Sequence, residues 1–315
     1  MFINGIAHYV PGDRVPNSYF KAVNGLDDEW IFSRTGIRTR SKANDAENTN
    51  TMALEAAKKL QETLPYSLAT VDLIVTGTYS PHDTVATASH VAQRHFQAGE
   101  ARCLTVSSAC SSLINALEIA EGYFASGKAT RALVMASEHN TAYCRENCPQ
   151  SGHLWGDGAI AMAVSNRPAG ARDARVASIY TRGLGHVGKA DVAVHLRPLL
   201  DGISMPEGRD VFVNACHYMI DALDRVAAAR GKTIADLAFI APHQANQRII
   251  NAIARQADIP AERMLSNIEE LGNTGCPSCG IALSQNVHRV KPGDLVALTV
   301  FGGGYSCGAA LFEFL

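Results

Sequence analysis

The feature that most constrains the fold of this 315-residue chain is a faint copy of its first half in its second half. Four stretches of the first half have counterparts that follow in the same order in the second half. The pairs are LATVDLIVTGTYS with TIADLAFIAPHQA, ARCLTVSSACSSLINAL with ERMLSNIEELGNTGCPSCGIAL, ATRALVMASEH with GDLVALTVFGGG, and GDGAIAMAV with CGAALFEF. Four matches in register indicate an internal duplication, in which each half repeats one set of strands and helices.

Short apolar runs alternate with segments of helical period along both halves. The runs at 73–75, 132–135 and 295–298 have the length of buried strands, whereas the segment from Leu113 to Tyr123 has the apolar spacing of one helix face. This alternation predicts an α/β protein whose sheets are covered by helices on both faces.

A polar stretch rich in glycine and arginine, at 166–175, separates the two copies. We therefore expect an N-terminal half at 1–170, which carries the nucleophile discussed below, and a C-terminal half at 171–315. In a duplicated fold the ends of equivalent elements meet near an approximate twofold axis, so a site can form where the halves face each other.

Charge and hydropathy exclude several classes of function. The chain has 28 basic and 30 acidic side chains and no block of like charge, so it has no field that attracts nucleic acid or an acidic membrane. No apolar run reaches the roughly 18 to 20 residues of a membrane span. The first residues lack the pattern of a secretion signal, and we expect a cytoplasmic protein whose eight cysteines are reduced.

Cys110 stands among serines and alanines in VSSACSSLINAL, where a strand is expected to end and a helix to begin. At that place a thiolate would face unpaired backbone N–H groups and the positive end of the helix dipole, which lower a thiol pKa from about 8.5. We therefore expect Cys110 to be a nucleophile that is ionised near neutral pH. Taken alone, such a cysteine is more often a small buried residue at a tight strand–helix junction.

Two residues of the second half could act with this thiol. His243 follows the apolar strand expected at 238–241, so its imidazole would be held rigidly at a pocket, as a base or a hydrogen-bond donor. Asn273 lies in ELGNTGCPSCG between small residues, and its carboxamide can donate to an oxygen that becomes negative. Each also fits a structural role, as a satisfied histidine or as an asparagine suited to left-handed backbone.

Gly303 belongs to the loop FGGGYSCG, which follows the strand expected at 295–300. A backbone N–H of this loop could form an oxyanion hole with the N–H of Cys110. The loop lacks the Lys-Ser/Thr ending of a phosphate loop. Cys276 and Cys279 have CxxC spacing without a second pair of ligands, so we expect neither a metal nor a redox cofactor.

Together these stretches resemble the β-ketoacyl-acyl carrier protein synthase III family of the thiolase-fold superfamily. The resemblance extends over nearly the whole chain, because seven segments occur in the family's order. They are DEWIFSRTGIRTR, SSACSSLINALEIAEGYFASGKATRALVMASE, WGDGAIAMAV, GRDVFVNA, APHQANQRII, GNTGCPSCGIAL and VKPGDLVALTVFGGGYSCGAALFEF. The resemblance implies a thiolase-like, five-layered αβαβα fold built from two duplicated halves, and a homodimer.

The family's reaction implies roles for the residues named above. The family's catalytic cysteine, histidine and asparagine correspond to Cys110, His243 and Asn273 in this chain. Cys110 would take an acyl group from acyl-CoA, and His243 and Asn273 would stabilise the enolate formed when malonyl-acyl carrier protein loses CO2. The N–H groups of Cys110 and Gly303 would hold the oxyanion of the Claisen condensation. The implied protein is an acyltransferase of fatty acid biosynthesis that needs no cofactor.

The resemblance also implies residues that bind the substrates. Trp30 and Arg34 match positions that clamp the CoA adenine, and Arg248 matches a basic residue at the pocket mouth that can meet a phosphate or the carrier protein. Val85, in HDTVATAS, replaces a phenylalanine that the partner subunit contributes to the acyl pocket, so we expect a primer longer than, or different from, acetyl. Pro149 stands at the position of a usual arginine, with Arg145 nearby.

These departures leave a specialised role open. A ketosynthase or acyltransferase of secondary metabolism, including polyketide synthesis, would use the same fold to join or transfer longer acyl groups. Release of CO2 separates condensation from plain transfer. A non-catalytic partner of an active synthase would be expected to lose its nucleophile, whereas Cys110, His243 and Asn273 are all present.

Overall fold

The computed structural model describes residues 1–171 and 173–315, and within them the central element is a nine-stranded mixed sheet. Its order is β11-β12-β13-β8-β1-β7-β6-β4-β5. The strands are β1 (Phe2–Tyr9), β4 (Leu73–Gly77), β5 (Arg102–Val106), β6 (Arg131–His139), β7 (Asp157–Ser165), β8 (Ala174–Gly183), β11 (Phe239–Pro242), β12 (Leu295–Gly302) and β13 (Ser306–Phe314). The three strands expected from short apolar runs are confirmed as parts of β4, β6 and β12.

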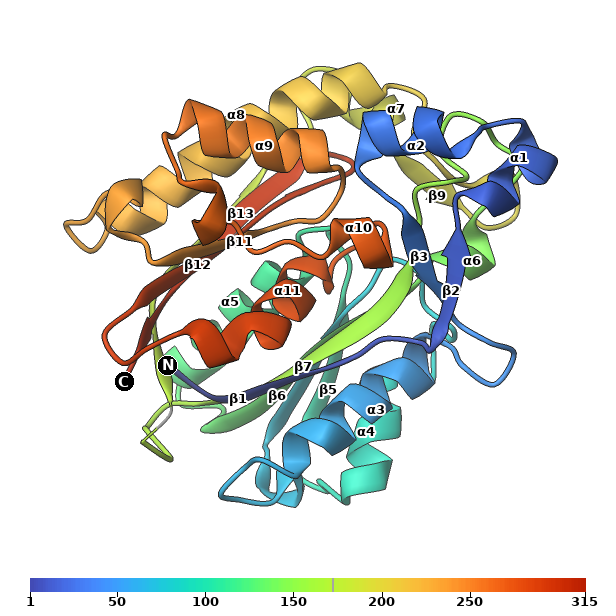
Figure 1. Ribbon diagram of the computed structural model, residues 1–315. Coiled ribbons are helices and arrows are strands. Elements are labelled where there is room, and N and C mark those ends of the chain that lie inside the picture. Colours follow the sequence, from blue (N-terminus) through green and yellow to red (C-terminus); the bar gives the residue numbers. More distant parts are fainter. Residues whose placement is uncertain (172) are drawn as a thin grey trace.

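Helices and sheet alternate in five layers, which Figure 1 shows from top to bottom. One pair of helices lies over the C-terminal strands, one pair lies between the two halves of the sheet, and one pair covers the N-terminal strands. In that order the pairs are α8 (Gly208–Ala228) with α9 (Gln247–Gln256), α5 (Ser112–Ala125) with α11 (Ser278–Asn286), and α3 (Thr49–Gln61) with α4 (Ala88–Phe96). The predicted αβαβα fold is confirmed, and the helices leave β4 and β7 buried along their whole length.

The two halves of the sheet have the same local order. From the centre outward the strands run β1-β7-β6-β4-β5 on one side and β8-β13-β12-β11 on the other, and β1 pairs antiparallel with β8. A short 3-10 helix precedes β4 (η1, Leu68–Thr70) and another precedes β11 (η2, Ile234–Asp236). Met264 forms a parallel bridge with Ile240 of β11, much as β5 pairs with β4. A boundary between halves at residue 170 stays a prediction.

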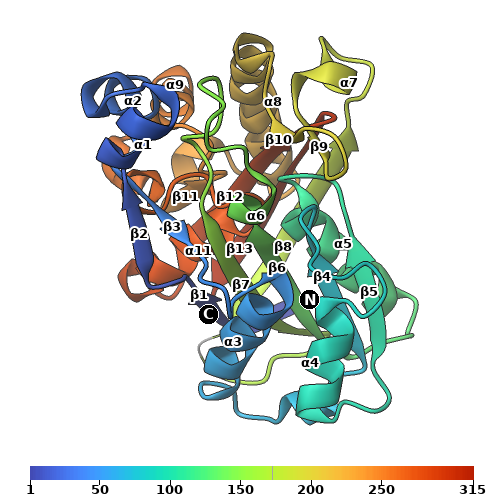
Figure 2. The same cartoon turned by 90° about the vertical axis from the view of Figure 1, so that its right-hand side faces the viewer.

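Smaller elements surround the end of the sheet at which β5, β11 and β12 finish. Figure 2 shows α2 near α9 on one side of this end, and α7, β9 and β10 on the other side of α8. The elements are β2 (Asp13–Pro16), α1 (Ser18–Asn24), α2 (Asp28–Thr35), β3 (Thr39–Lys42), α6 (Asn140–Tyr143), α7 (Ala190–Ala193), β9 (His195–Arg197), β10 (Gly202–Ser204) and α10 (Ile268–Leu271). They enclose the region into which the strand ends deliver polar side chains. The short helices η3 (Ala261–Arg263) and η4 (Val287–Arg289) lie at the other end of the sheet, where β11 and β12 begin.

Two further properties of the described residues bear on function. Every helix among them is too short or too polar to cross a bilayer. These residues also contain no group of three or more histidine, cysteine, aspartate or glutamate side chains placed to hold a metal ion. The eight cysteines are free thiols, and Cys276 and Cys279 of the CxxC pair are buried.

Candidate active site

Cys110 lies in a tight connection between β5, which ends at Val106, and α5, which begins at Ser112. The strand–helix junction predicted there is confirmed. Ala109 has a φ of 49°, a left-handed conformation that residues other than glycine rarely adopt. The N–H of Ser112 donates to the carbonyl of Ala109 at 3.1 Å, which begins the first turn directly after the cysteine. The backbone on both sides of Cys110 is therefore held in one strained shape.

The loop that follows β12 packs against the backbone of Cys110. A Cβ atom at Gly302 would lie only 2.9 Å from the nitrogen of Cys110 and 2.9 Å from the carbonyl oxygen of Ser108, so a side chain does not fit there. The N–H groups of Gly303 and of Cys110 itself act on the Cys110 thiol and lower its pKa, against the effect of burial. The two donors expected to form an oxyanion hole thus lie beside the sulphur.

Cys110, His243 and Asn273 line one cavity of about 40 Å³, together with Gly302 and Gly303. The other side chains around this cavity are apolar, among them several from α8 and the start of α9. Strand ends and turns that are far apart in the sequence thus bring a thiol, an imidazole and a carboxamide to one small, mostly apolar space.

His243 continues the ladder between β11 and β12, because its N–H donates to the carbonyl of Thr299 at 2.8 Å. Its Nδ1 atom lies 2.8 Å from the hydroxyl oxygen of Ser278, at the start of α11. Burial lowers the pKa of His243 to about 4. The imidazole is therefore neutral near pH 7.

Asn273 is fixed through its backbone, which donates to Leu154 at 2.8 Å and accepts from Gly156 at 3.0 Å. Its side-chain oxygen accepts a hydrogen bond of 3.0 Å from the N–H of Gly275. With that oxygen occupied, the group that the carboxamide can still offer is its NH2 donor.

The ionisation of Cys110 differs from the prediction. Burial, followed by the nearby carboxylate of Glu138, raises the pKa of Cys110 to about 12, although the N–H of Gly303 acts in the opposite direction. The expectation of a thiolate near neutral pH is therefore wrong for the free protein. Local N–H donors favour the thiolate, but its removal from water disfavours it more strongly.

Glu138, at the end of β6, is a buried carboxylate that sequence reasoning missed. It accepts hydrogen bonds from the hydroxyl of Thr78 at 3.1 Å, the N–H of Tyr79 at 3.2 Å, and both the N–H and the hydroxyl of Ser80. The thiol of Cys276 donates to it at 2.8 Å. Burial raises the pKa of Glu138 to about 7. An acidic residue at the end of the apolar run RALVMASEH was the signal for this network.

Trp30, Arg34 and Arg248 meet at a larger cavity of about 740 Å³. The guanidinium of Arg34 lies 4.4 Å from the centre of the Trp30 ring, one turn away on α2, and Arg248 comes from the first turn of α9. Met205 lines both this cavity and the small one beside Cys110, so the two adjoin.

Two further arginines at this larger cavity, Arg209 and Arg255, were missed by the sequence analysis. They come from the first turn of α8 and the last turn of α9, and no acidic side chain is among the described residues that line the cavity. Several guanidinium groups around one cavity, without carboxylates to neutralise them, form a site that can bind phosphate groups. Arg145 instead donates to the carbonyl of Leu200, and neither it nor Pro149 lines the cavity.

Val85 is placed apart from Cys110 within one chain. It is 82 % exposed, in a loop where the carboxylate of Asp83 accepts from the N–H groups of Val85 and Ala86. A further cavity of about 370 Å³ beside Cys110 is not lined by Val85 either. Any role of Val85 in the acyl pocket therefore requires a second copy of the chain.

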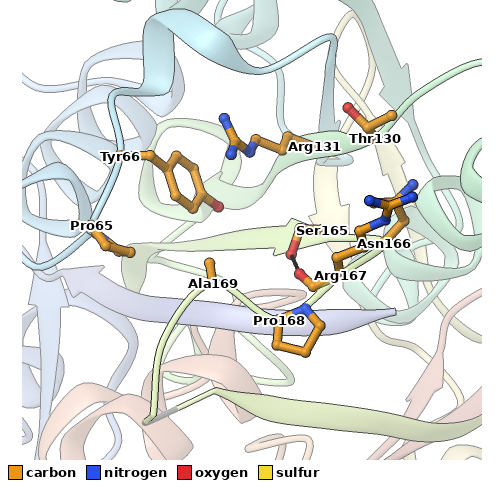
Figure 3. Close-up of a pocket in the computed structure, with 9 residues that line it drawn as sticks. All are labelled: Pro65, Tyr66, Thr130, Arg131, Ser165, Asn166, Arg167, Pro168 and Ala169. Atoms are coloured by element: carbon orange, nitrogen blue, oxygen red, sulfur yellow. Dashed lines mark hydrogen bonds between the residues drawn. The ribbon is translucent and has the colours of Figure 1, made fainter.

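A separate cavity of about 580 Å³ lies at the opposite end of β6 and β7. Figure 3 shows the residues that line it. Arg131 and Ser165 line it and pair with each other across these strands, whereas Glu138 pairs with Gly158 at the Cys110 end. The guanidinium of Arg131 stacks over the ring of Tyr66 at 4.5 Å. None of the described residues that line it was predicted for the site.

Comparison with known families finds the model of 3-oxoacyl-[acyl-carrier-protein (ACP)] synthase III at residues 104–183. The model of the C-terminal part of the same enzyme matches residues 227–314. Among curated proteins, the chain is 31 % identical over 313 residues to a beta-ketoacyl-[acyl-carrier-protein] synthase III of Rhizorhabdus wittichii, with 98 % of each chain covered. It is 32 % identical over 315 residues to the enzyme of that name from Aquifex aeolicus, with 99 % of each chain covered.

Solved structures give the same result. The crystal structure of 3-oxoacyl-[acyl-carrier-protein] synthase III from Aquifex aeolicus superposes with a TM-score of 0.91 at 32 % identity, and 99 % of each chain is covered. The priming β-ketosynthase of the R1128 polyketide pathway superposes with a TM-score of 0.89 at 27 % identity, covering 99 % of this chain and 95 % of that one.

Proposed function

Because this chain belongs to the 3-oxoacyl-[acyl-carrier-protein] synthase III family of thiolase-fold condensing enzymes, we propose that Cys110, His243 and Asn273 are its catalytic residues. The enzyme is an acyltransferase of the condensing type, and the relatives that it matches are named beta-ketoacyl-[acyl-carrier-protein] synthase III. We place its reaction in fatty acid biosynthesis. One observation carries the assignment of residues: the three side chains line the same cavity of about 40 Å³.

In the first step, the sulphur of Cys110 attacks the carbonyl carbon of an acyl-CoA. A C–S bond to Cys110 forms, the C–S bond to CoA breaks, and the thiol proton of Cys110 ends on the departing CoA sulphur. The thiol loses its proton as it attacks, because its pKa is about 12. Neutral His243, in the same cavity, is the base that relays this proton.

The oxyanion of this step forms beside two backbone donors. The N–H groups of Cys110 and Gly303 lie beside the sulphur in the free protein, where they favour its negative form. The same two groups stabilise the negative oxygen when the acyl carbon is attacked. The loop does not need to reorganise, because Gly302 packs tightly against the backbone of Cys110.

In the second step, malonyl-acyl carrier protein loses CO2, and the electron pair of the broken C–C bond forms an enolate. Asn273 donates its NH2 group and His243 its Nε2–H to the enolate oxygen. The enolate carbon then attacks the acyl-enzyme, and the C–S bond to Cys110 breaks to release a β-ketoacyl thioester. The thiolate left on Cys110 takes up one proton from water, which restores the thiol of the free enzyme. Both steps balance in atoms and electrons without a metal or redox group, so we assign none.

His243 serves first as acceptor and then as donor because of its contact with Ser278. A hydroxyl can either accept a proton from Nδ1 or donate one to it. The 2.8 Å contact therefore supports both tautomers of the neutral ring, and Nε2 is a base in one and a donor in the other.

The larger cavity is the entrance for the phosphate-bearing substrates. Trp30 offers a ring face for the CoA adenine, and Arg34 and Arg248 offer charge to phosphates or to the carrier protein. Arg209 and Arg255 extend this positive lining. Its continuity with the cavity beside Cys110, through Met205, supports a single path from the surface to the thiol.

We also assign the active form to a homodimer. Strand β5 lies at one edge of the sheet, directly before Cys110, and an edge strand presents unpaired backbone groups to a second chain. Val85, apolar and 82 % exposed, is the side chain that a partner would contribute to the acyl pocket. Valine in place of a larger side chain admits primers beyond acetyl.

Intact-protein mass spectrometry after incubation with a panel of acyl-CoAs tests the assignment of the nucleophile. The wild type gains the mass of one acyl group and Cys110→Ala gains none. Cys148→Ala is the matched control, because Cys148 is also partly exposed but lies outside the cavities that contain Cys110. Acylation of Cys110→Ala at the wild-type rate would overturn the assignment.

A further inference from the structure

We infer that Glu138 is a positioning residue of the condensation step, because its side chain holds the turn that orients the carboxamide of Asn273. This inference rests on the proposed function, in which Asn273 donates to the enolate oxygen. It adds a residue that touches no substrate and acts through Asn273. Glu138 is fully buried near the end of β6, and its partners come from two segments that lie far apart in the sequence.

On one side, the carboxylate of Glu138 accepts hydrogen bonds from the loop that follows β4. The donors are the hydroxyl of Thr78 at 3.1 Å, the N–H groups of Tyr79 and Ser80 at 3.2 and 3.0 Å, and the hydroxyl of Ser80. The Ser80 hydroxyl oxygen itself accepts from the N–H of His139 at 2.9 Å, so its own proton is free for Glu138. These donors from one loop fix the position of the carboxylate.

On its other side, the same carboxylate supports the turn that follows Asn273. The thiol of Cys276 donates to Oε1 of Glu138 at 2.8 Å. Gly275 lies directly against the side chains of this network. A Cβ atom there would be 2.8 Å from Cγ of Glu138 and 2.4 Å from the hydroxyl oxygen of Tyr79. The turn therefore rests on a carboxylate that is itself held in place.

Gly275 transmits this support to the side chain of Asn273. Its N–H donates to Oδ1 of Asn273 at 3.0 Å, which sets the orientation of the planar carboxamide and leaves the NH2 group as its donor. The backbone of Asn273 is held from the same region, because the side-chain amide of Asn140 donates to its carbonyl at 3.3 Å. A shift of Gly275 would therefore move the donor that the enolate oxygen needs.

An ionised carboxylate matches all of the donors around Glu138. It accepts on both oxygens, whereas the amide of a glutamine has one acceptor oxygen and an NH2 group that would face a donor. Glu138→Gln thus keeps the size of the side chain but leaves buried donors without an acceptor, which the backbone must move to relieve. Burial raises the pKa of Glu138 to about 7, so the group is ionised at pH 8.

A double-mutant cycle separates positioning through Asn273 from a general structural role. Acylation is followed by intact-protein mass with an acyl-CoA that loads the wild type, and condensation by single turnovers of acylated enzyme with malonyl-acyl carrier protein, both at pH 8. We expect Glu138→Gln to lower the condensation rate at least about tenfold and to leave acylation within about threefold of the wild type. In the Asn273→Ala background, Glu138→Gln should lower condensation less than about twofold, because the donor that it positions is already absent.

Glu47→Gln is the matched control. The carboxylate of Glu47 also joins two segments, since it accepts from the hydroxyl of Tyr9 and the N–H of Asn44, but it lies outside the cavities that contain Cys110. Both steps should keep their wild-type rates in this variant.

Cys276→Ala takes the place of Glu138→Gln in the same cycle if Glu138→Gln does not fold. It removes only the thiol that donates to Glu138, so the loss of condensation should be smaller, at about fivefold. Cys276→Ser, whose hydroxyl also donates, should restore the rate.

The outcomes are distinguishable. A loss that is confined to condensation and disappears in the Asn273→Ala background supports the inference. Equal losses in both steps, an undiminished further loss in the Asn273→Ala background, or condensation at the wild-type rate overturns it, while the proposed function stands. Failure of the wild type to acylate or to condense, or condensation by Asn273→Ala at the wild-type rate, overturns the proposed role of the site and this inference with it.

Discussion

At the scale of single residues, burial controls the chemistry of the site. It raises the pKa of Cys110 to about 12 and of Glu138 to about 7, and it lowers the pKa of His243 to about 4. All three shifts favour the neutral form of the group. The free enzyme thus holds an un-ionised thiol beside a neutral imidazole, and the charge that appears during catalysis forms among fixed donors.

Alkylation of Cys110 by iodoacetamide reports this ionisation directly. Only the thiolate reacts with iodoacetamide. At pH values below the pKa, the thiolate fraction increases about tenfold for each unit by which the pH is raised. The alkylation rate should therefore rise about tenfold per unit from pH 6 to pH 9 without a plateau. Peptide mass spectrometry separates the individual cysteines. Cys148 is an internal control: hydrogen bonds from Ser151 outweigh its partial burial and lower its pKa, so its rate should level off earlier. A plateau for Cys110 near pH 7 would contradict the shift.

Asn273→Ala should separate the two steps of the reaction. We expect acylation of Cys110 to continue, while condensation falls by about 100- to 1000-fold because one donor to the enolate oxygen is lost. Uptake of labelled acyl groups measures the first step, and formation of the β-ketoacyl product measures the second. Asn286→Ala, at the end of α11 and away from the cavities that contain Cys110, should change neither. Equal losses in both steps would contradict the role assigned to Asn273.

At the scale of elements, the site is built where strands end and the chain turns sharply. Cys110 follows β5, His243 follows β11 and Gly303 follows β12, so three strands determine where the chemistry lies. The turn at Cys110 stores strain at Ala109, whose φ is 49°. Gly302 packs closely on that turn and keeps it in position. Precise placement of the nucleophile is thus a property of backbone packing.

Gly302→Ala tests this packing. The new Cβ would lie 2.9 Å from the nitrogen of Cys110, so the turn must move, and a displacement of about 1 Å can cost about 100-fold in rate. We expect acylation of Cys110 to slow by roughly that factor. Gly183→Ala, on β8 next to this strand pair, meets no atom within 4 Å and serves as control. Wild-type rates for Gly302→Ala would show that the contact does not position the nucleophile.

At the scale of the whole molecule, much of the fold could be predicted from the duplicated pattern. Cys110, His243 and Asn273 were recognisable because each follows a strand or turn with a local signature. The buried Glu138 and cavity residues such as Tyr79 were not, because their environment comes from segments distant in sequence. The thiol pKa was predicted in the wrong direction for the same reason: the helix start is local, whereas burial depends on tertiary packing.

Assembly belongs to this scale as well. The proposed homodimer predicts a solution mass of about twice the 33.6 kDa of one chain, measured by light scattering after size-exclusion chromatography. Val85→Phe places a larger side chain in the acyl pocket of the partner subunit. The variant should keep the mass of a dimer, and its acylation should shift toward acetyl-CoA. A mass near that of one chain in active enzyme would contradict the dimer and the role of Val85.

The most direct test of the account follows CO2 and product in one reaction. Acylated enzyme is mixed with malonyl-acyl carrier protein labelled in its free carboxyl group, and released CO2 and β-ketoacyl product are measured together. We expect equal amounts of both from the wild type, and a loss of product of at least about a thousandfold in Cys110→Ala. Full product formation by Cys110→Ala, or acyl transfer by the wild type without release of CO2, would contradict it.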